Sequence, residues 1–284
     1  MERDELISKK VSDTLIRAAS NFREDQKKVY EKAIKEETNP STKWVLESLL
    51  ENSEVAQKNS SPLCDDTGIP HLFLEVGKNK KVSGEFLESI QQGIAEGLQK
   101  LPGRPMAIKG NDIERLEQSG GLDVDPGAVS PAPIIIKPVE ENVIRLYILM
   151  QGGGPEIRGK TYRVFHQHKL EVIIDEIVKW TIDEVSKLGC TPCIPAIGIG
   201  RTHFEATSLM IEAMIRGNFN KQSDIEKEIT NNINMSNIGP LGLKGNNTAL
   251  ATFVNVGPQR ASGVRIVSLR LCCCVEPRVA SVLL

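Results

Sequence analysis

The sequence predicts an α/β protein, with a helical N-terminal region over about residues 1–60 and an α/β body over about residues 61–284. In the first sixty residues, apolar side chains recur at spacings of three and four, which is typical of amphipathic helices. Further along, short alternating or fully apolar runs predict strands of a mixed sheet, and helical patterns interleave with them. No linker of distinct composition divides the chain, so we expect one large domain spanning residues 1–284.

Helices and strands can be assigned in order. Residues 12–22 and 23–37 predict two helices, and Pro40 and Ser41 predict the start of a third, with Ser41 as its cap. The remaining predicted elements are a strand at 71–77, a helix at 86–101, strands at 132–139 and 142–150, a helix at 169–189, a strand at 194–200, a helix at 204–217, a glycine loop followed by a strand within 237–256, and a last strand at 264–271. Residues 102–133 are rich in Gly, Pro and Asp and are expected to be irregular.

Composition excludes several classes of partner. The net charge of −2 and the aromatic content of 4% offer no basic or base-stacking surface, so we expect no nucleic acid. The N-terminus MERDELISKK is polar, and no run of about 20 apolar residues could cross a membrane. We therefore expect a cytoplasmic protein without membrane association, whose thiols stay reduced.

Six cysteines occur at three places: Cys64 in SPLCDDTG, Cys190 and Cys193 in LGCTPCIP, and the triplet Cys272–Cys274. Three thiolates from distant segments can hold an iron–sulfur cluster, and a cluster with three protein ligands leaves one iron open as a Lewis acid. The alternatives are three disulfides, a zinc site built from the C-x-x-C pair and the triplet, or a buried packing role for Cys193. A redox dithiol is not favoured, because the C-x-x-C motif follows a predicted helix and precedes a strand.

Other polar motifs have both a functional and an ordinary interpretation. Asp66, two residues after Cys64, could be a catalytic carboxylate or part of a surface turn. The guanidinium of Arg278 could bind a carboxylate or lie at the surface. The glycine runs QGGGPE and GPLGLKG, the second containing Lys244, could offer backbone amides to an anion or simply form turns. His203 could be an acid or base, or a capping or solvated side chain.

Together these motifs resemble those of a known family, the alpha-type catalytic domain of class I fumarases and L-tartrate dehydratases, which are iron–sulfur hydro-lyases. PLCDDTG is similar to PxCQDTG, GCTPCIPAIGIGRT to CPP…GIGGT, QGGGPE to KGGGSE, GPLGLKGNNTALA to GPMGLGGKTTALA, and CVEPRVAS to CWAxRRAS. The matches follow the family's order from residue 45 to the C-terminus.

The resemblance implies a 4Fe–4S cluster with one open iron and the following site. Its cysteine ligands are Cys64, Cys190 rather than Cys193, and Cys274, although one inserted residue would move the third ligand to Cys273 or Cys272. Asp66 is the catalytic carboxylate, and the substrate-binding residues are Gly153, Gly154 and Arg278.

The chain also departs from the family pattern. DVDPGAVSPAP at residues 123–133 stands where the family has an NTGDNTPA stretch, and Gln151 replaces a lysine. Pro155 and Arg201 replace a serine and a glycine, Pro277 stands at a variable position, and Val279 replaces the second arginine. These differences bear more on the substrate than on cluster binding.

The resemblance further implies an alpha subunit that works with a separate beta-type subunit, as a heterotetramer, because the chain ends soon after the third cysteine. The implied reaction is reversible hydration of a small dicarboxylate, with fumarate and malate as the first expectation and L-tartrate and oxaloacetate as the second. A zinc- or cluster-stabilised binding subunit without chemistry of its own is the alternative, supported by the altered residues 123–133.

Overall fold

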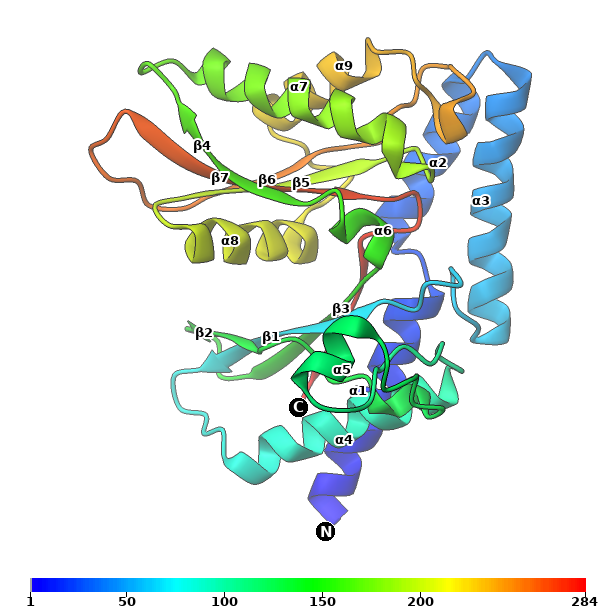
Figure 1. Cartoon of the computed structure of the whole chain (residues 1–284), viewed down its shortest axis with the longest axis vertical. Helices are drawn as coiled ribbons and strands as arrows, with labels where there is room; N and C mark the ends of the chain where they lie inside the picture. Colours follow the sequence, from blue (N-terminus) through cyan, green and yellow to red (C-terminus); the bar gives the residue numbers. More distant parts are fainter. Residues whose placement is uncertain (1) are drawn as a thin grey trace. The chain divides into compact units, whose positions relative to one another are not determined.

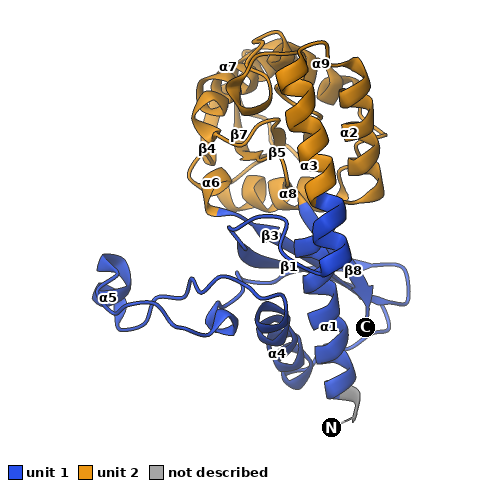
Figure 2. Ribbon diagram, turned by 90° about the vertical axis from the view of Figure 1, so that its right-hand side faces the viewer, with its two compact units in different colours: residues 1–21, 53–152, 278–284 blue, residues 22–52, 153–277 orange. Residues whose placement is uncertain are grey.

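The computed structural model describes residues 2–284, with side chains from residue 4 onward. The chain forms two compact units, coloured separately in Figure 2. Unit 1 contains the chain up to Asn21 together with Ser53–Gly152 and Arg278–Leu284, and unit 2 contains Phe22–Asn52 and Gly153–Pro277. Each unit has a mixed sheet with helices, which confirms the α/β class. Because the units interleave along the chain, no single linker separates them, and one domain over residues 1–284 stays a prediction.

The sheet of unit 1 has the strand order β2-β1-β3-β8. Its strands are β1 (Ile69–Gly77), β2 (Ile135–Val139), β3 (Ile144–Gln151) and β8 (Arg278–Leu283). β2 and β3 follow one another in the chain but do not pair, because β1 lies between them, parallel to β2 and antiparallel to β3. β8 pairs antiparallel with β3. The strand predicted at 264–271 is confirmed as β7 (Val264–Cys272), but it is not the last strand, because β8 follows it.

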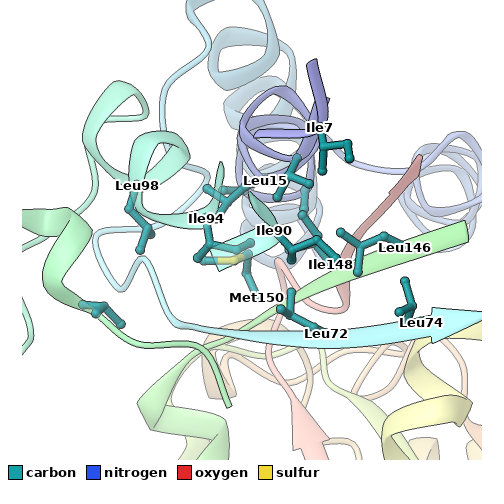
Figure 3. Close-up of a cluster of buried hydrophobic side chains, with 14 of the residues drawn as sticks. Ile7, Leu15, Leu72, Leu74, Ile90, Ile94, Leu98, Leu146, Ile148 and Met150 are labelled. Atoms are coloured by element: carbon teal, nitrogen blue, oxygen red, sulfur yellow. The ribbon is translucent and has the colours of Figure 1, made fainter. Parts of the chain in front are cut away.

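One face of this sheet packs against α1 (Glu2–Ser20) and α4 (Gly84–Lys100). Alternate residues of β1 and β3 face these helices, as the two-residue period of a strand requires. The resulting core, shown in Figure 3, contains Leu72, Leu74, Leu146, Ile148 and Met150 from the strands, Ile7 and Leu15 from α1, and Ile90, Ile94 and Leu98 from α4. Residues 102–133 hold only the short α5 (Asp112–Glu117) and η1 (Pro126–Ala128), as predicted for an irregular segment.

The sheet of unit 2 has the order β4-β7-β5-β6, formed by β4 (Lys160–Phe165), β5 (Ile194–Gly200), β6 (Phe253–Val256) and β7 (Val264–Cys272). β5 is buried along its whole length and pairs parallel with β6 and antiparallel with β7. Figure 1 shows α8 (His203–Arg216) on one face and α7 (Leu170–Leu188) with α9 (Asp224–Asn234) on the other. The long helix predicted at 169–189 is confirmed as α7, and Gly189 ends it in a positive-φ conformation.

The helical N-terminal region is confirmed by α1, α2 (Glu24–Glu36) and α3 (Pro40–Asn59). The predicted cap of α3 is wrong, because the side-chain oxygen of Asn39 accepts a hydrogen bond from the Ser41 amide at 3.1 Å. Asn39 therefore caps the helix, and Pro40 takes the first helical position, where its missing amide hydrogen costs nothing. No helix in the described chain combines the length and apolar character needed to cross a bilayer.

Gly93 lets α1 and α4 approach closely, and this gives the first prediction. A Cβ at Gly93 would lie 2.5 Å from the Ser8 carbonyl oxygen and 2.6 Å from Val11 Cβ. We expect Gly93→Ala to lower the free energy of unfolding by about 1–3 kcal/mol through overpacking. Gly84→Ala is the control, because a Cβ there meets no atom within 4 Å.

Urea unfolding of both variants measures the difference. Gly84→Ala should leave stability unchanged or raise it by up to about 1 kcal/mol. A Gly93→Ala protein as stable as the parent would contradict the proposed packing of these two helices.

Candidate active site

The loop of Cys64 lies in unit 1, between α3 and β1. Its Cys64 and Asp66 are half-buried, whereas Thr67 is fully buried. The Thr67 hydroxyl accepts a hydrogen bond from the Arg104 amide at 2.8 Å, and Arg104 Nη1 lies 3.0 Å from an Asp65 carboxylate oxygen. Arg104 thus adds a cation to this loop. No sequence motif marks Arg104, because it lies in the irregular segment at residues 102–133, well after the Cys64 loop.

Arg278 holds the same loop from β8. It is buried, with 2% of its surface exposed, which excludes the interpretation as a surface arginine. Its Nη1 donates a hydrogen bond to the Asp66 carbonyl oxygen at 2.9 Å. Gly68 makes this approach possible: its φ is +84°, and a Cβ there would lie 2.7 Å from both Arg278 Nη2 and the Gln151 carbonyl oxygen. Arg278 therefore positions the loop, and its contact with a substrate stays a prediction.

Gln151 ends β3 beside Gly68. Its side chain is 4% exposed, and within the described residues its Nε2 has no hydrogen-bond partner. Burying a donor without an acceptor costs about 1–3 kcal/mol. A bound ligand could provide the missing acceptor. In the sequence, Gln151 was noted only as a departure from the family pattern.

In unit 2 the structure brings Cys190 and Cys274 together. Cys190 is exposed just after α7, and Cys274 lies in the turn after β7 with 7% of its surface exposed. The Cys274 amide donates a hydrogen bond to the Cys190 carbonyl oxygen at 3.0 Å. The buried Tyr30 donates its hydroxyl to the Cys274 carbonyl oxygen at 2.5 Å. Two of the three predicted ligands thus come from segments joined by a direct backbone contact.

The other cysteines differ in environment. Cys272 Sγ is buried 3.4 Å from Met214 Sδ and 3.8 Å from Arg270 Nη1, and burial raises the pKa of its thiol well above the ordinary value. Cys193 is fully buried, and burial raises its pKa to about 12, as expected for a packing residue. All six cysteines are thiols, which contradicts the alternative of three disulfides.

Among the side chains described, from residue 4 onward, no group of three or more His, Cys, Asp or Glu is arranged to hold a metal ion. Cys190 and Cys274 lie together in unit 2, and Cys64 belongs to unit 1.

The glycine loop at Gly239–Gly245 packs onto the Cys190 segment. The Thr191 hydroxyl donates to the Gly239 carbonyl oxygen at 2.8 Å, and the Leu241 amide donates to the Thr191 carbonyl oxygen at 3.2 Å. The amides of residues 242–245 all donate to acceptors within residues 237–240. This loop therefore does not offer these amides to an anion, so the prediction of an anion cradle in GPLGLKG is wrong.

Glu37 fixes the far side of this loop. One of its oxygens accepts hydrogen bonds from the amides of Thr38 and Asn39, and the other accepts from the Asn246 amide and the Asn247 side chain, all at 3.0 Å. Burial alone would raise the pKa of Glu37, but these hydrogen bonds, led by that of Asn39, lower it below the ordinary value.

Three further predicted positions lie at helix starts. Gly153 and Gly154 are exposed and begin the short α6 (Gly153–Glu156), with open space around Gly154. His203 is exposed at the start of α8, but Thr202 is the cap, since its hydroxyl accepts from the Glu205 amide at 3.1 Å. His203 is therefore a solvated side chain, as one of its sequence interpretations held.

The chain is similar in sequence to known proteins over most of its length. A protein of Methanocaldococcus jannaschii assigned as an L(+)-tartrate dehydratase alpha subunit is 29% identical over 281 residues, which cover 94% of each chain. The L(+)-tartrate dehydratase alpha subunit of Escherichia coli K12 is 25% identical over 238 residues, covering 81% of this chain and 75% of its own.

These similarities, with residues 8–282 matching one enzyme family, define the chain as a hydro-lyase, an enzyme that adds or removes water. The family is the fumarate hydratase (Fumerase) family, and the chain belongs to it.

The lowered pKa of Glu37 predicts a pH-dependent contribution to stability. A carboxyl group whose pKa is lowered by folding stabilises the protein above its unfolded pKa, and that contribution is lost as the pH falls through the folded value. We expect Glu37→Gln to lower the free energy of unfolding by about 1.5–3 kcal/mol near neutral pH, where hydrogen bonds to the charged carboxylate are lost. The difference should shrink below the ordinary carboxyl pKa of 4.5.

Urea unfolding at neutral and acidic pH tests this, with the exposed neighbour Glu36→Gln as control, expected to change stability by less than about 0.5 kcal/mol. A Glu37→Gln effect that is the same at both pH values would show that the carboxylate charge is not involved.

The buried amide of Gln151 leads to a different kind of prediction. Gln151→Met keeps the size of the side chain and removes the donor that has no acceptor among the described residues. We expect the variant, without ligand, to gain about 1–3 kcal/mol of unfolding free energy. Thr181→Val is the matched variant, because the Thr181 hydroxyl in α7 is likewise buried without a partner in the described chain.

Thermal unfolding of the ligand-free protein measures both changes. Loss of stability in Gln151→Met, with a gain in Thr181→Val, would mean that the Gln151 amide has an acceptor after all.

Proposed function

We propose that the chain is the alpha subunit of a two-subunit hydro-lyase that reversibly hydrates a small dicarboxylate. Fumarate and malate are the first candidate pair, and L-tartrate and oxaloacetate the second. Membership of the fumarate hydratase family supports the reaction class, and the names of the two relatives support the tartrate pair and the role as an alpha subunit.

One observation carries the proposal: the hydrogen bond between the Cys274 amide and the Cys190 carbonyl oxygen. It joins two thiol-bearing segments that are far apart in the sequence, in a reduced state and with Cys190 exposed. Thiolates are the donors that iron–sulfur clusters require, so this pair fits such a group. Cys64 would supply the third thiolate, as the family resemblance implies.

Cys274 is the better third-segment ligand on chemical grounds. Cys272 would have to give up its buried contact with Met214, and burial disfavours its thiolate. The Cys274 amide contacts the Cys190 backbone directly, which brings this residue to the segment of the second proposed ligand.

A bound 4Fe–4S cluster with three cysteine ligands would supply an open iron that acts as a Lewis acid on the substrate hydroxyl and carboxylate. Asp66 would hold or move a proton beside the reacting carbon, with its loop kept in place by Arg278. The amides of Gly153 and Gly154 would bind carboxylate oxygens, and Gln151 would donate its buried amide to the same dianion. Arg104 would add positive charge where the enolate-like intermediate carries negative charge.

A separate beta-type subunit would complete the enzyme as a heterotetramer in the cytoplasm. The naming of both relatives as alpha subunits supports a partner of this kind. The chain alone should then bind the cluster but turn over its substrate slowly.

Cysteine variants provide the direct test. After anaerobic reconstitution, the protein should contain about four irons with labile sulfide, and with its partner subunit it should convert fumarate or L-tartrate. Cys274→Ser and Cys190→Ser should lose this iron and nearly all activity, because the cluster loses a ligand. Cys193→Ala is the control and should retain both.

Iron and sulfide analysis, with absorbance assays of each acid, measures these outcomes. Zinc without sulfide would contradict the cluster and favour a metal-stabilised binding subunit, and a Cys274→Ser protein with full iron content would move the third ligand to another cysteine.

A further inference from the structure

Arg270 is a buried cation close to the proposed cluster ligands. It lies in β7, two residues before Cys272, and only 1% of its surface is exposed. An arginine remains charged in proteins, and a buried charge requires partners. Its partners belong to two segments of unit 2 that the proposed function uses.

The first partner is Glu276, which follows the Cys274 turn and is also 1% exposed. Arg270 Nη1 donates to one Glu276 carboxylate oxygen, and Nη2 lies 3.4 Å from the other. A guanidinium that contacts both oxygens of a carboxylate fixes orientation as well as distance. The Glu276 amide in turn donates to the Cys273 carbonyl oxygen at 3.0 Å, so the ion pair and the cysteine turn form one connected network.

The second partner is Glu156, the last residue of α6, which begins with Gly153 and Gly154. Arg270 Nε donates to a Glu156 carboxylate oxygen at 3.2 Å. One guanidinium thus contacts both the segment that carries Cys274 and the segment that carries the glycine run.

Stability alone is a weak explanation for this arrangement. Replacing a buried ion pair by apolar side chains of similar size often leaves a protein equally or more stable, because both charges pay a large desolvation cost. What an apolar pair cannot reproduce is the directional contact of three nitrogen atoms with two separate carboxylates.

We propose that Arg270 is a positioning residue that holds the Cys274 turn through Glu276 and the Gly153–Glu156 helix through Glu156, so that a cluster ligand and the substrate-binding glycines keep a fixed geometry. The inference rests on the proposed function for the roles of Cys274 and the glycines. The network itself consists only of contacts within unit 2.

The main test is the double variant Arg270→Met/Glu276→Leu, which replaces the pair by apolar side chains. Arg270→Met alone should be strongly destabilised, because it leaves Glu276 buried without its cation. The double variant should recover most of that stability in urea unfolding. Its Cys274 thiol should nevertheless react severalfold faster with an alkylating reagent in the cluster-free protein, and its reconstituted cluster, after chemical reduction to the paramagnetic state, should show an altered electron paramagnetic resonance spectrum.

Arg145→Met/Glu75→Leu is the matched control. This ion pair joins two strands of unit 1 at 2.7 Å, with Glu75 almost fully buried. It should affect stability only, with the alkylation rate of Cys274 and the spectrum unchanged. A stable Arg270→Met/Glu276→Leu protein with parental alkylation rate and spectrum would overturn the proposal, since the pair would then be purely structural.

Glu156→Gln tests the second arm without risk to folding, because Glu156 is 66% exposed. Hydrogen exchange of the amides of residues 157–159, which donate to carbonyl oxygens of α6, should accelerate severalfold, and unchanged exchange would remove α6 from the network. Alkylation and hydrogen exchange need no bound iron, so they test the role of Arg270 separately from the proposed function. A protein that binds no iron would contradict the proposed function, and these two measurements would still decide whether Arg270 positions the two segments.

Discussion

The backbone hydrogen bond from Cys274 to Cys190 is the contact on which the candidate site of unit 2 depends. It joins the end of β7 to the end of α7, so it can form only when the sheet and its covering helix are in register. Tyr30 occupies the other side of the turn and donates its hydroxyl to the Cys274 carbonyl oxygen. Both backbone groups of Cys274 are thus hydrogen-bonded, so the turn that carries this thiol is fixed at its amide and at its carbonyl.

Buried polar side chains also join separate segments around this site. Glu37 accepts four hydrogen bonds that tie the end of α2 to residues 246 and 247, and Thr191 ties the Cys190 segment to Gly239. Each is a buried side chain whose polar atoms are satisfied, as a rigid interior requires. Gln151 of unit 1 differs, because its buried amide lacks an acceptor in the described chain. Structural needs explain the first two residues, whereas the amide of Gln151 keeps a donor that a ligand could satisfy.

Periodicity alone was sufficient to predict α7 and the strand β5, because each buries a face or a whole strand whose pattern is local in sequence. Strand pairing was not predictable in the same way. β8 pairs with β3, which lies far earlier in the chain. β2 and β3 are connected by a short turn, but β1 lies between them in the sheet. The predicted cap of α3, Ser41, lies two residues after the observed cap, Asn39. Both residue types are good caps, and only the geometry distinguishes them.

The same distinction between local and distant information applies to the site. Cys64, Cys190 and Asp66 stand out because their flanking residues form motifs, whereas Arg104, Arg270 and Glu276 carry no local pattern and acquire meaning only from their contacts.

The two kinds of residue answer different questions. The motifs around the thiols are the part of the sequence that points to a reaction class. The family resemblance marks Gln151, in place of a lysine, and residues 123–133 as departures, and these bear on which acid the proposed site would bind. A neutral amide donates a hydrogen bond but adds no charge, so replacing an ammonium group near Arg278 lowers the positive charge available to a carboxylate. The reaction class therefore follows from membership of the family, whereas Gln151 and residues 123–133 are where this chain would set its choice of acid.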